Sequence, residues 1–247
     1  PRSVQQIQDK MVYIMGHPRY LQNRRDELLA ILKTPEVEKD AIKKVTLMSE
    51  LGNVYFLANE FARAVETLRE VCRIQEKLND KAGMSSAYGN IGSILMQSKD
   101  LAGAEESYAR AIEIKEQLMD HKSLVELYSS RANVLLMLAR VPEAEQIIKK
   151  SLKLNQKNNN TVGLVMDYRN LGNVCLQKND FPEAEKNYLK ALDLNIQAGN
   201  KREMAEDYRN QFNLYMQKED WGQAEKYGLK ALEIAEEIKN HRAALYD

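Results

Sequence analysis

The side chains best suited to bind a ligand lie in two similar segments, DYRNLGN at 167–173 and DYRNQFN at 207–213. Each segment places carboxamides three residues apart, as in Asn170 and Asn173, and on a helix these lie about 60° apart and share one face. A carboxamide has two N–H donors and a carbonyl acceptor, which match the backbone groups of an extended peptide. Asparagine is also unfavourable inside a helix, because its side chain competes for backbone hydrogen bonds. The segments therefore predict either a row of groups that holds a peptide, or hydrogen bonds that tie neighbouring helices together.

An arginine precedes the first asparagine of each segment. Arg169 and Arg209 bring positive charge next to the carboxamides. Asp167, Asp207 and Glu206 are close enough in sequence to neutralise that charge, and solvated ion pairs contribute little to stability. The arginines therefore either add charge to a binding surface or are paired within the protein.

The sequence lacks the motifs of catalysis and metal binding. Its three histidines, His17, His121 and His241, are far apart, and none belongs to an HxxxH or HExxH pattern. No GxxxxGK[ST], GxGxxG or GxSxG segment occurs, so neither a phosphate cradle nor a nucleophile elbow is predicted. Most carboxylates have lysines three or four residues away, as on solvated helix faces. We therefore expect a protein that is not an enzyme and has no cofactor and no metal site.

Composition narrows the choice of partner and compartment. The 247 residues contain 36 Lys and Arg and 36 Asp and Glu, so the net charge is zero and no partnership with nucleic acid or a membrane is indicated. The longest apolar run, VLLMLA at 134–139, is much shorter than the roughly 18 residues of a membrane span. The two cysteines, Cys72 and Cys175, fall on helix faces expected to be buried, so reduced thiols and a cytoplasmic location are expected. The chain opens PRSVQQ and ends HRAALYD, where another helix is expected to begin, so we expect a fragment or a processed chain.

The sequence repeats with a period of forty residues, and the two asparagine segments occupy the same place in successive repeats. Tyr88, Tyr128, Tyr168 and Tyr208 form one column of the period, and their spacing never slips. Such self-similarity indicates a repeat architecture. The other columns hold small residues, bulky apolar residues and alanines, in that order: Gly52, Gly92, Ala132 and Gly172; Phe61, Leu101, Val141, Phe181 and Trp221; Ala64, Ala104, Ala144, Ala184 and Ala224.

Each repeat is predicted to be a helical hairpin. From Tyr168 the apolar and small residues follow the i, i+3, i+4, i+7 spacing of an amphipathic helix. LQKNDFPEAEK is a turn in which Asp180 is the expected N-cap and Pro182 lies near the first helical position, before a second helix over about 182–196. One hairpin cannot bury its apolar face alone, so stacked neighbours must share a core. The glycine and alanine columns are predicted to let helices approach closely, and the bulky apolar column is predicted to fill the space between hairpins. The prediction is an all-α solenoid of five hairpins, with repeats at about 43–82, 83–122, 123–162, 163–202 and 203–242 of a domain that spans 43–247.

Residues 1–42 match the columns poorly. SVQQIQDKMVYIM and RYLQNRRDELLAILK nevertheless have helical periodicity, and the TP dipeptide at 34–35 is typical of a helix start. Leu21 and Leu28 fall on two of the apolar columns. This segment is therefore predicted to be a pair of capping helices or a degenerate repeat.

The columns that contain Tyr168, Leu171, Gly172, Ala184 and Tyr188, together with Ala191, resemble the tetratricopeptide repeat. The forty-residue period is similar to the subclass found in kinesin light chains and in LGN/Pins-type adaptors. The resemblance implies a right-handed superhelix whose first helices line a concave groove. It places these residues in the groove: Asn90, Asn133, Arg169, Asn170, Asn173, Arg209, Asn210 and Asn213. The carboxylate clamp of co-chaperone repeats would have three of its five positions filled here, by Arg169, Asn173 and Asn210.

Three functions remain open from the sequence. The first is an adaptor that binds an extended or helical peptide segment of another protein in the groove. The second is a structural scaffold that acts through self-association. The third is a regulatory sensor domain, similar to the repeat halves of bacterial peptide-pheromone receptors, in which a ligand tightens the superhelix.

Overall fold

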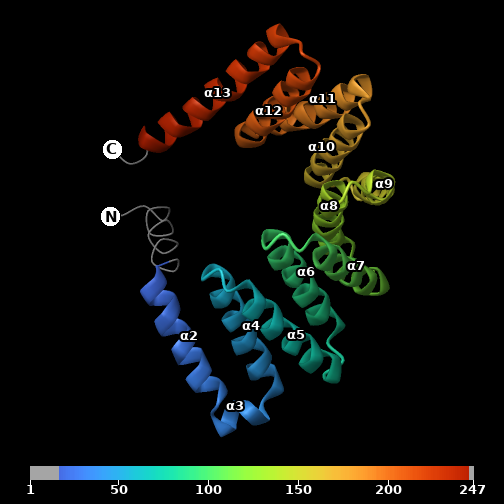
Figure 1. Ribbon diagram of the computed structural model, residues 1–247. Coiled ribbons are helices and arrows are strands. Elements are labelled where there is room, and N and C mark those ends of the chain that lie inside the picture. The colour runs from blue at the N-terminus through green and yellow to red at the C-terminus, as the bar shows by residue number, and fades with distance from the viewer. Residues whose placement is uncertain (1–16, 245–247) are drawn as a thin grey trace. The chain divides into compact units, whose positions relative to one another are not determined.

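The computed structural model describes residues 17–244, except the side chains of 121–123 and 240–244 (Figure 1). The helix expected over SVQQIQDKMVYIM lies outside the described residues. All described regular structure is helical, which confirms the predicted all-α fold. The helices are α2 (Pro18–Leu32), α3 (Pro35–Lys39), α4 (Ala41–Leu57), α5 (Phe61–Lys77), α6 (Lys81–Gln97), α7 (Leu101–Gln117), α8 (His121–Met137), α9 (Val141–Lys157), α10 (Thr161–Gln177), α11 (Phe181–Ala198), α12 (Lys201–Gln217) and α13 (Trp221–Ala244).

The turns explain the regular helix lengths. Two residues after α4, α5 and α10 end, the chain has a residue in the left-handed region: Asn59, Asn79 and Asn179 have φ of 59°, 55° and 57°. Asparagine tolerates this conformation better than most residues. After Asn179, α11 is capped at its N-terminus by the Asp180 carboxylate, which accepts from the backbone N–H of Glu183 at 3.3 Å. The predicted N-cap is therefore confirmed.

The chain divides into two compact units, residues 1–134 (unit 1) and 135–247 (unit 2), and the boundary falls within α8. In unit 1, α2 packs on α4, and consecutive helices from α4 to α7 pack on one another. The predicted apolar residues Leu21 and Leu28 of α2 are buried. The division into a capping pair at 1–42 and repeats over 43–247 stays a prediction.

Unit 2 stacks α9 to α13 in the same consecutive manner. The small-residue column works here as predicted, because a Cβ atom on Gly172 would lie 2.3 Å from the ring of Tyr188. In the last hairpin the large and the small residue change places. Phe212 occupies the glycine position of α12, and Gly228 occupies the tyrosine position of α13, where a Cβ atom would lie 3.2 Å from the Phe212 ring. The break in the column is therefore a compensated swap of large and small residues.

One column differs from its prediction in the last hairpin. Phe181 packs against the core cluster that contains Leu214 of α12. Trp221, at the same position forty residues later, is 61% exposed. No first helix follows α13 in the described part of the chain, so Trp221 has nothing equivalent to α12 to cover it.

Candidate functional site

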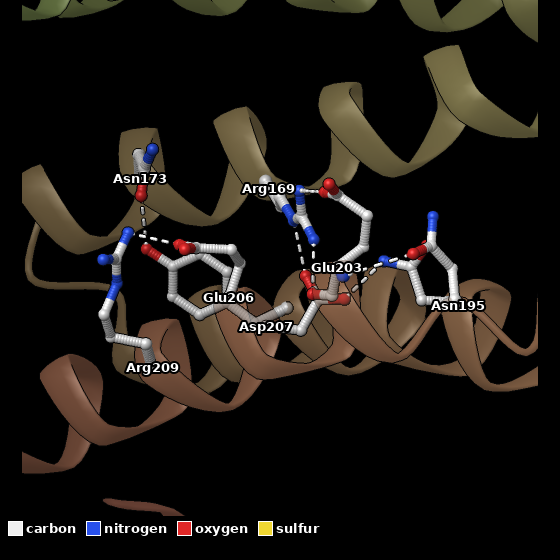
Figure 2. A network of polar contacts seen from close by, with 9 residues as sticks. Arg169, Asn173, Asn195, Glu203, Glu206, Asp207 and Arg209 are labelled. Carbon is white, nitrogen blue, oxygen red and sulfur yellow. Dashed lines mark hydrogen bonds and ion pairs between the residues drawn. The ribbon is translucent and has the colours of Figure 1, made fainter. Parts of the chain in front are cut away.

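Arg169 of α10 is held by side-chain and backbone groups of α12. Its Nη1 atom donates to Glu203 Oε2 at 2.6 Å, its Nη2 atom donates to the Glu203 carbonyl at 2.8 Å, and its Nε atom donates to Asp207. Figure 2 shows the guanidinium between these two residues. Burial opposes the charge, but the bonds to Asp207 and Glu203 outweigh it and raise the pKa of Arg169. Of the two roles left open by the sequence, the structure shows pairing within the protein.

Two buried carboxylates tie second helices to the first helices that follow them. Asn195 Nδ2 donates to Asp207 at 2.6 Å, and Asn155 Nδ2 donates to Asp167 at 2.6 Å. Burial raises the pKa of Asp167 to about 6, although hydrogen bonds from Asn155 and Ser151 oppose the shift. Sequence reasoning missed Asn155 and Asn195. The signal was present, because each precedes its aspartate by twelve residues and the two pairs are forty residues apart.

The asparagines of α10 are used inside unit 2. Asn170 is 6% exposed. The carbonyl of Asn173 accepts from the Tyr188 hydroxyl at 2.6 Å (Figure 2). A binding role for either residue stays a prediction.

The remaining predicted site residues of unit 2 are more accessible. Arg209 is exposed and forms an ion pair with Glu206 of its own helix (Figure 2). Asn210 is half-buried and Asn213 is exposed, both on α12. The structure does not bring these residues into the Arg169 network, because no described hydrogen bond or ion pair joins Arg209, Asn210 or Asn213 to Arg169 or to its two partners.

Unit 1 contains a groove that runs across its first helices. A cavity of about 180 Å³ lies between α4 and α6, and a second cavity of about 310 Å³ lies between α6 and α8. Asn90 and Ser93 line both, so the two cavities adjoin, and together they are called the unit 1 groove. Asn133, another predicted residue, is exposed on α8 but does not line either cavity.

The unit 1 groove combines free carboxamides with an apolar wall. The side chains of Asn53 and Asn90 are exposed and have no hydrogen-bond partner among the described residues. The Ser93 hydroxyl lies 3.0 Å from the Tyr108 hydroxyl and is already engaged. Phe56 and Leu68 contribute apolar surface to the smaller cavity. The groove can therefore hydrogen-bond a polar backbone and also accept an apolar side chain.

A further cavity, of about 290 Å³, is lined by residues of α5, α6 and α7. It contains Arg69, Arg73 and Arg110, which sequence reasoning did not single out. Arg73 pairs with Glu70 at 2.5 Å, and Arg110 pairs with Glu106 at 2.8 Å. Two of its three arginines are therefore already neutralised.

Groups suited to covalent or metal chemistry are not assembled in the described residues. Burial raises the pKa of the Cys72 thiol to about 11 and also raises the pKa of the Cys175 thiol, so neither thiol is activated. No group of three His, Cys, Asp or Glu side chains is placed to hold a metal ion within the part searched, and none of its helices is long and apolar enough to cross a membrane. The chemistry that the groove offers is hydrogen bonding and apolar contact.

Solved structures with similar folds cover most of the chain. BtubC (BKLC) from P. vanneervenii is 17% identical, with a TM-score of 0.72 over 89% of each chain. The apo form of RapI is 15% identical, with a TM-score of 0.76 over 88% of this chain and 60% of RapI. The TPR-like repeats of a putative kinesin light chain from Podosopora anserina are 14% identical, with a TM-score of 0.63 over 79% of this chain and 96% of that chain. At these identities the likeness concerns the fold alone.

Sequence comparison gives the family. No curated protein matches the chain. Models of the tetratricopeptide repeat match residues 45–81, and also 83–157, 123–197 and 165–237 in overlapping copies. These matches cover more than half of the sequence and coincide with the observed helical hairpins. The chain therefore belongs to the tetratricopeptide repeat family.

Proposed function

We propose that this chain is a non-catalytic interaction module that binds a peptide segment of a partner protein in the unit 1 groove. The tetratricopeptide repeat fold supports the general role in protein interaction. A Rap protein of similar fold was solved in complex with competence and sporulation factor, at 13% identity and a TM-score of 0.66, which is a precedent for ligand binding by this architecture. Because Cys72 and Cys175 are free thiols, the cytoplasm is the compartment that we expect.

The observation that carries the proposal is the pair of exposed carboxamides in the groove that have no hydrogen-bond partner among the described residues. Asn53 and Asn90 are thirty-seven residues apart in sequence, yet both line the cavity between α4 and α6. Each can donate to a carbonyl and accept from an N–H of an extended chain. Two such contacts would contribute roughly 1–3 kcal/mol to binding.

The experiment selects peptides from a randomised dodecapeptide library displayed on phage, with the immobilised protein as target. Affinities of the selected peptides are then measured by fluorescence anisotropy. We expect Asn53→Ala/Asn90→Ala to weaken binding about tenfold or more, while the unfolding midpoint is retained because alanine is a good helix former. Gln117→Ala, which removes an exposed amide of α7, is the matched control and leaves the affinity unchanged. Peptides that bind the double variant as tightly as the native protein would refute the proposal.

Self-association is a second candidate function, and it rests on α13. Trp221, Leu229 and Leu232 are 61%, 60% and 61% exposed, and at 100° per residue they fall within about 80° of one another. Sedimentation velocity at several concentrations tests this function. A dimer that Leu229→Glu/Leu232→Glu abolishes supports it, and a monomer throughout the series excludes it.

A further inference from the structure

The larger cavity of the unit 1 groove is lined at the repeat positions that Arg169 and Asp207 occupy in unit 2. Gly89 of α6 precedes Arg169 by eighty residues, and Leu127 of α8 precedes Asp207 by the same number. Both Gly89 and Leu127 line the cavity of about 310 Å³. In unit 2 the guanidinium crosses from α10 to α12. In unit 1 glycine sends no side chain from α6, and a Cβ atom there would lie 3.2 Å from the Leu127 side chain of α8. The cavity therefore borders the position from which an arginine extends two repeats later.

The charges around the cavity favour a cation. Glu126 of α8 lines it, is exposed, and has no partner among the described residues. The counterpart of Glu126 in unit 2, Glu206, is paired with Arg209. Lys115 also lines the cavity, but its Nζ atom lies 2.8 Å from Asp120. The carboxylate of Glu126 is therefore the uncompensated charge of the cavity.

We propose that this cavity receives an arginine side chain of the bound peptide. The inference rests on the proposed function and names the side chain that the partner must carry. The guanidinium takes the place of the missing Arg169 counterpart and pairs with the Glu126 carboxylate. Asn90 and Ser130, which also line the cavity, supply further oxygen acceptors. Arginine suits the site better than lysine, because a planar guanidinium has five N–H donors for several acceptors at once.

The test compares a phage-selected peptide that contains arginine with the same peptide carrying citrulline, a neutral isostere, at that position. Replacement of arginine by citrulline is expected to weaken binding to the native protein about tenfold. Glu126→Gln is expected to weaken binding of the arginine peptide about fivefold and to leave the citrulline peptide unaffected. Glu113→Gln, which neutralises an exposed carboxylate of α7 outside the cavity, is the matched control for both peptides.

A second variant fills the cavity from within. Gly89→Arg/Leu127→Asp rebuilds between α6 and α8 the arginine and aspartate that unit 2 has between α10 and α12. We expect this variant to lose binding of the arginine peptide. If it does not fold, the surface variant Glu126→Gln still decides the question.

The outcomes separate the two proposals. Peptides that need Asn53 and Asn90 but lack a basic residue, or an arginine peptide that is indifferent to Glu126→Gln, overturn the arginine inference and leave the proposed function standing. If no peptide is selected, or binding is indifferent to Asn53→Ala/Asn90→Ala, the proposed function fails and the inference fails with it.

Discussion

Replacement of Gln211 by leucine should stabilise the protein. Gln211 is 0% exposed within α12, and neither its Oε1 nor its Nε2 atom has a hydrogen-bond partner among the described residues. The same repeat position holds Leu51 and Ile91, both of which are buried. Burial of an unpaired amide costs roughly 1–3 kcal/mol. Leucine has no polar atoms and is the buried residue at this position in the first repeat, so Gln211→Leu should raise the free energy of unfolding by about that amount.

The assay is urea unfolding followed by far-ultraviolet circular dichroism, with the midpoint and the slope both fitted. For a chain of this length each kcal/mol also raises Tm by about 2–4 °C. Gln217→Leu, an exposed position of the same helix, is the matched control and should change the stability by less than about 0.5 kcal/mol. An unchanged or lower midpoint for Gln211→Leu, with an unchanged slope, would refute the reasoning and show that the amide is satisfied by water or by another group.

Three further predictions concern unit 2. Burial raises the pKa of Asp167 to about 6, above the roughly 3.9 of an unfolded aspartate. The folded state therefore holds this proton more tightly than the unfolded state does. The contribution of Asp167 to stability consequently falls as pH rises from about 4 to about 6. The free energy of unfolding of Asp167→Asn, relative to that of the native protein, should therefore rise by about 2 kcal/mol between pH 4 and pH 7, as measured by urea unfolding. A difference between the two proteins that does not change with pH would contradict the raised pKa. Arg169→Met leaves Asp207 buried without its cation and should cost roughly 3 kcal/mol of unfolding free energy. Arg209→Met, at an exposed ion pair, should cost less than about 1 kcal/mol. Equal unfolding midpoints for the two variants would be evidence against the Arg169 network. Gly172→Ala places a methyl carbon 2.3 Å from a tyrosine ring and should lower the unfolding free energy by about 1–3 kcal/mol, while an unchanged midpoint would mean that the ring moves freely.

The repeat architecture could be predicted from the sequence because it depends on local and periodic features. The alanine of Ala184 recurs every forty residues, and the small residue of Gly172 and the cap of Asp180 recur at that spacing in most repeats. Each has a single structural explanation. The hairpins, the turn and the cap are therefore all found where the periodicity indicates.

The use of the polar side chains could not be predicted in the same way. Arg169 has its partners 34 and 38 residues away on another helix, and the sequence offered Asp167 as an equally good candidate. Only the packing of α10 on α12 decides between them. Asn90 was predicted to line the groove, but the larger cavity of the unit 1 groove was not predicted, because it is lined by Gly89, whereas sequence reasoning started from the polar residues that are present.

Photo-cross-linking shows whether a partner peptide lies across α4, α6 and α8, as we propose. A phage-selected peptide carrying benzoylphenylalanine is irradiated with the protein, and the attached residues are identified by mass spectrometry. We expect attachment around Asn53, Phe56, Asn90 and Ser130, and loss of attachment in Asn53→Ala/Asn90→Ala. Attachment confined to α10 and α12, around Asn173 and Asn213, would contradict it.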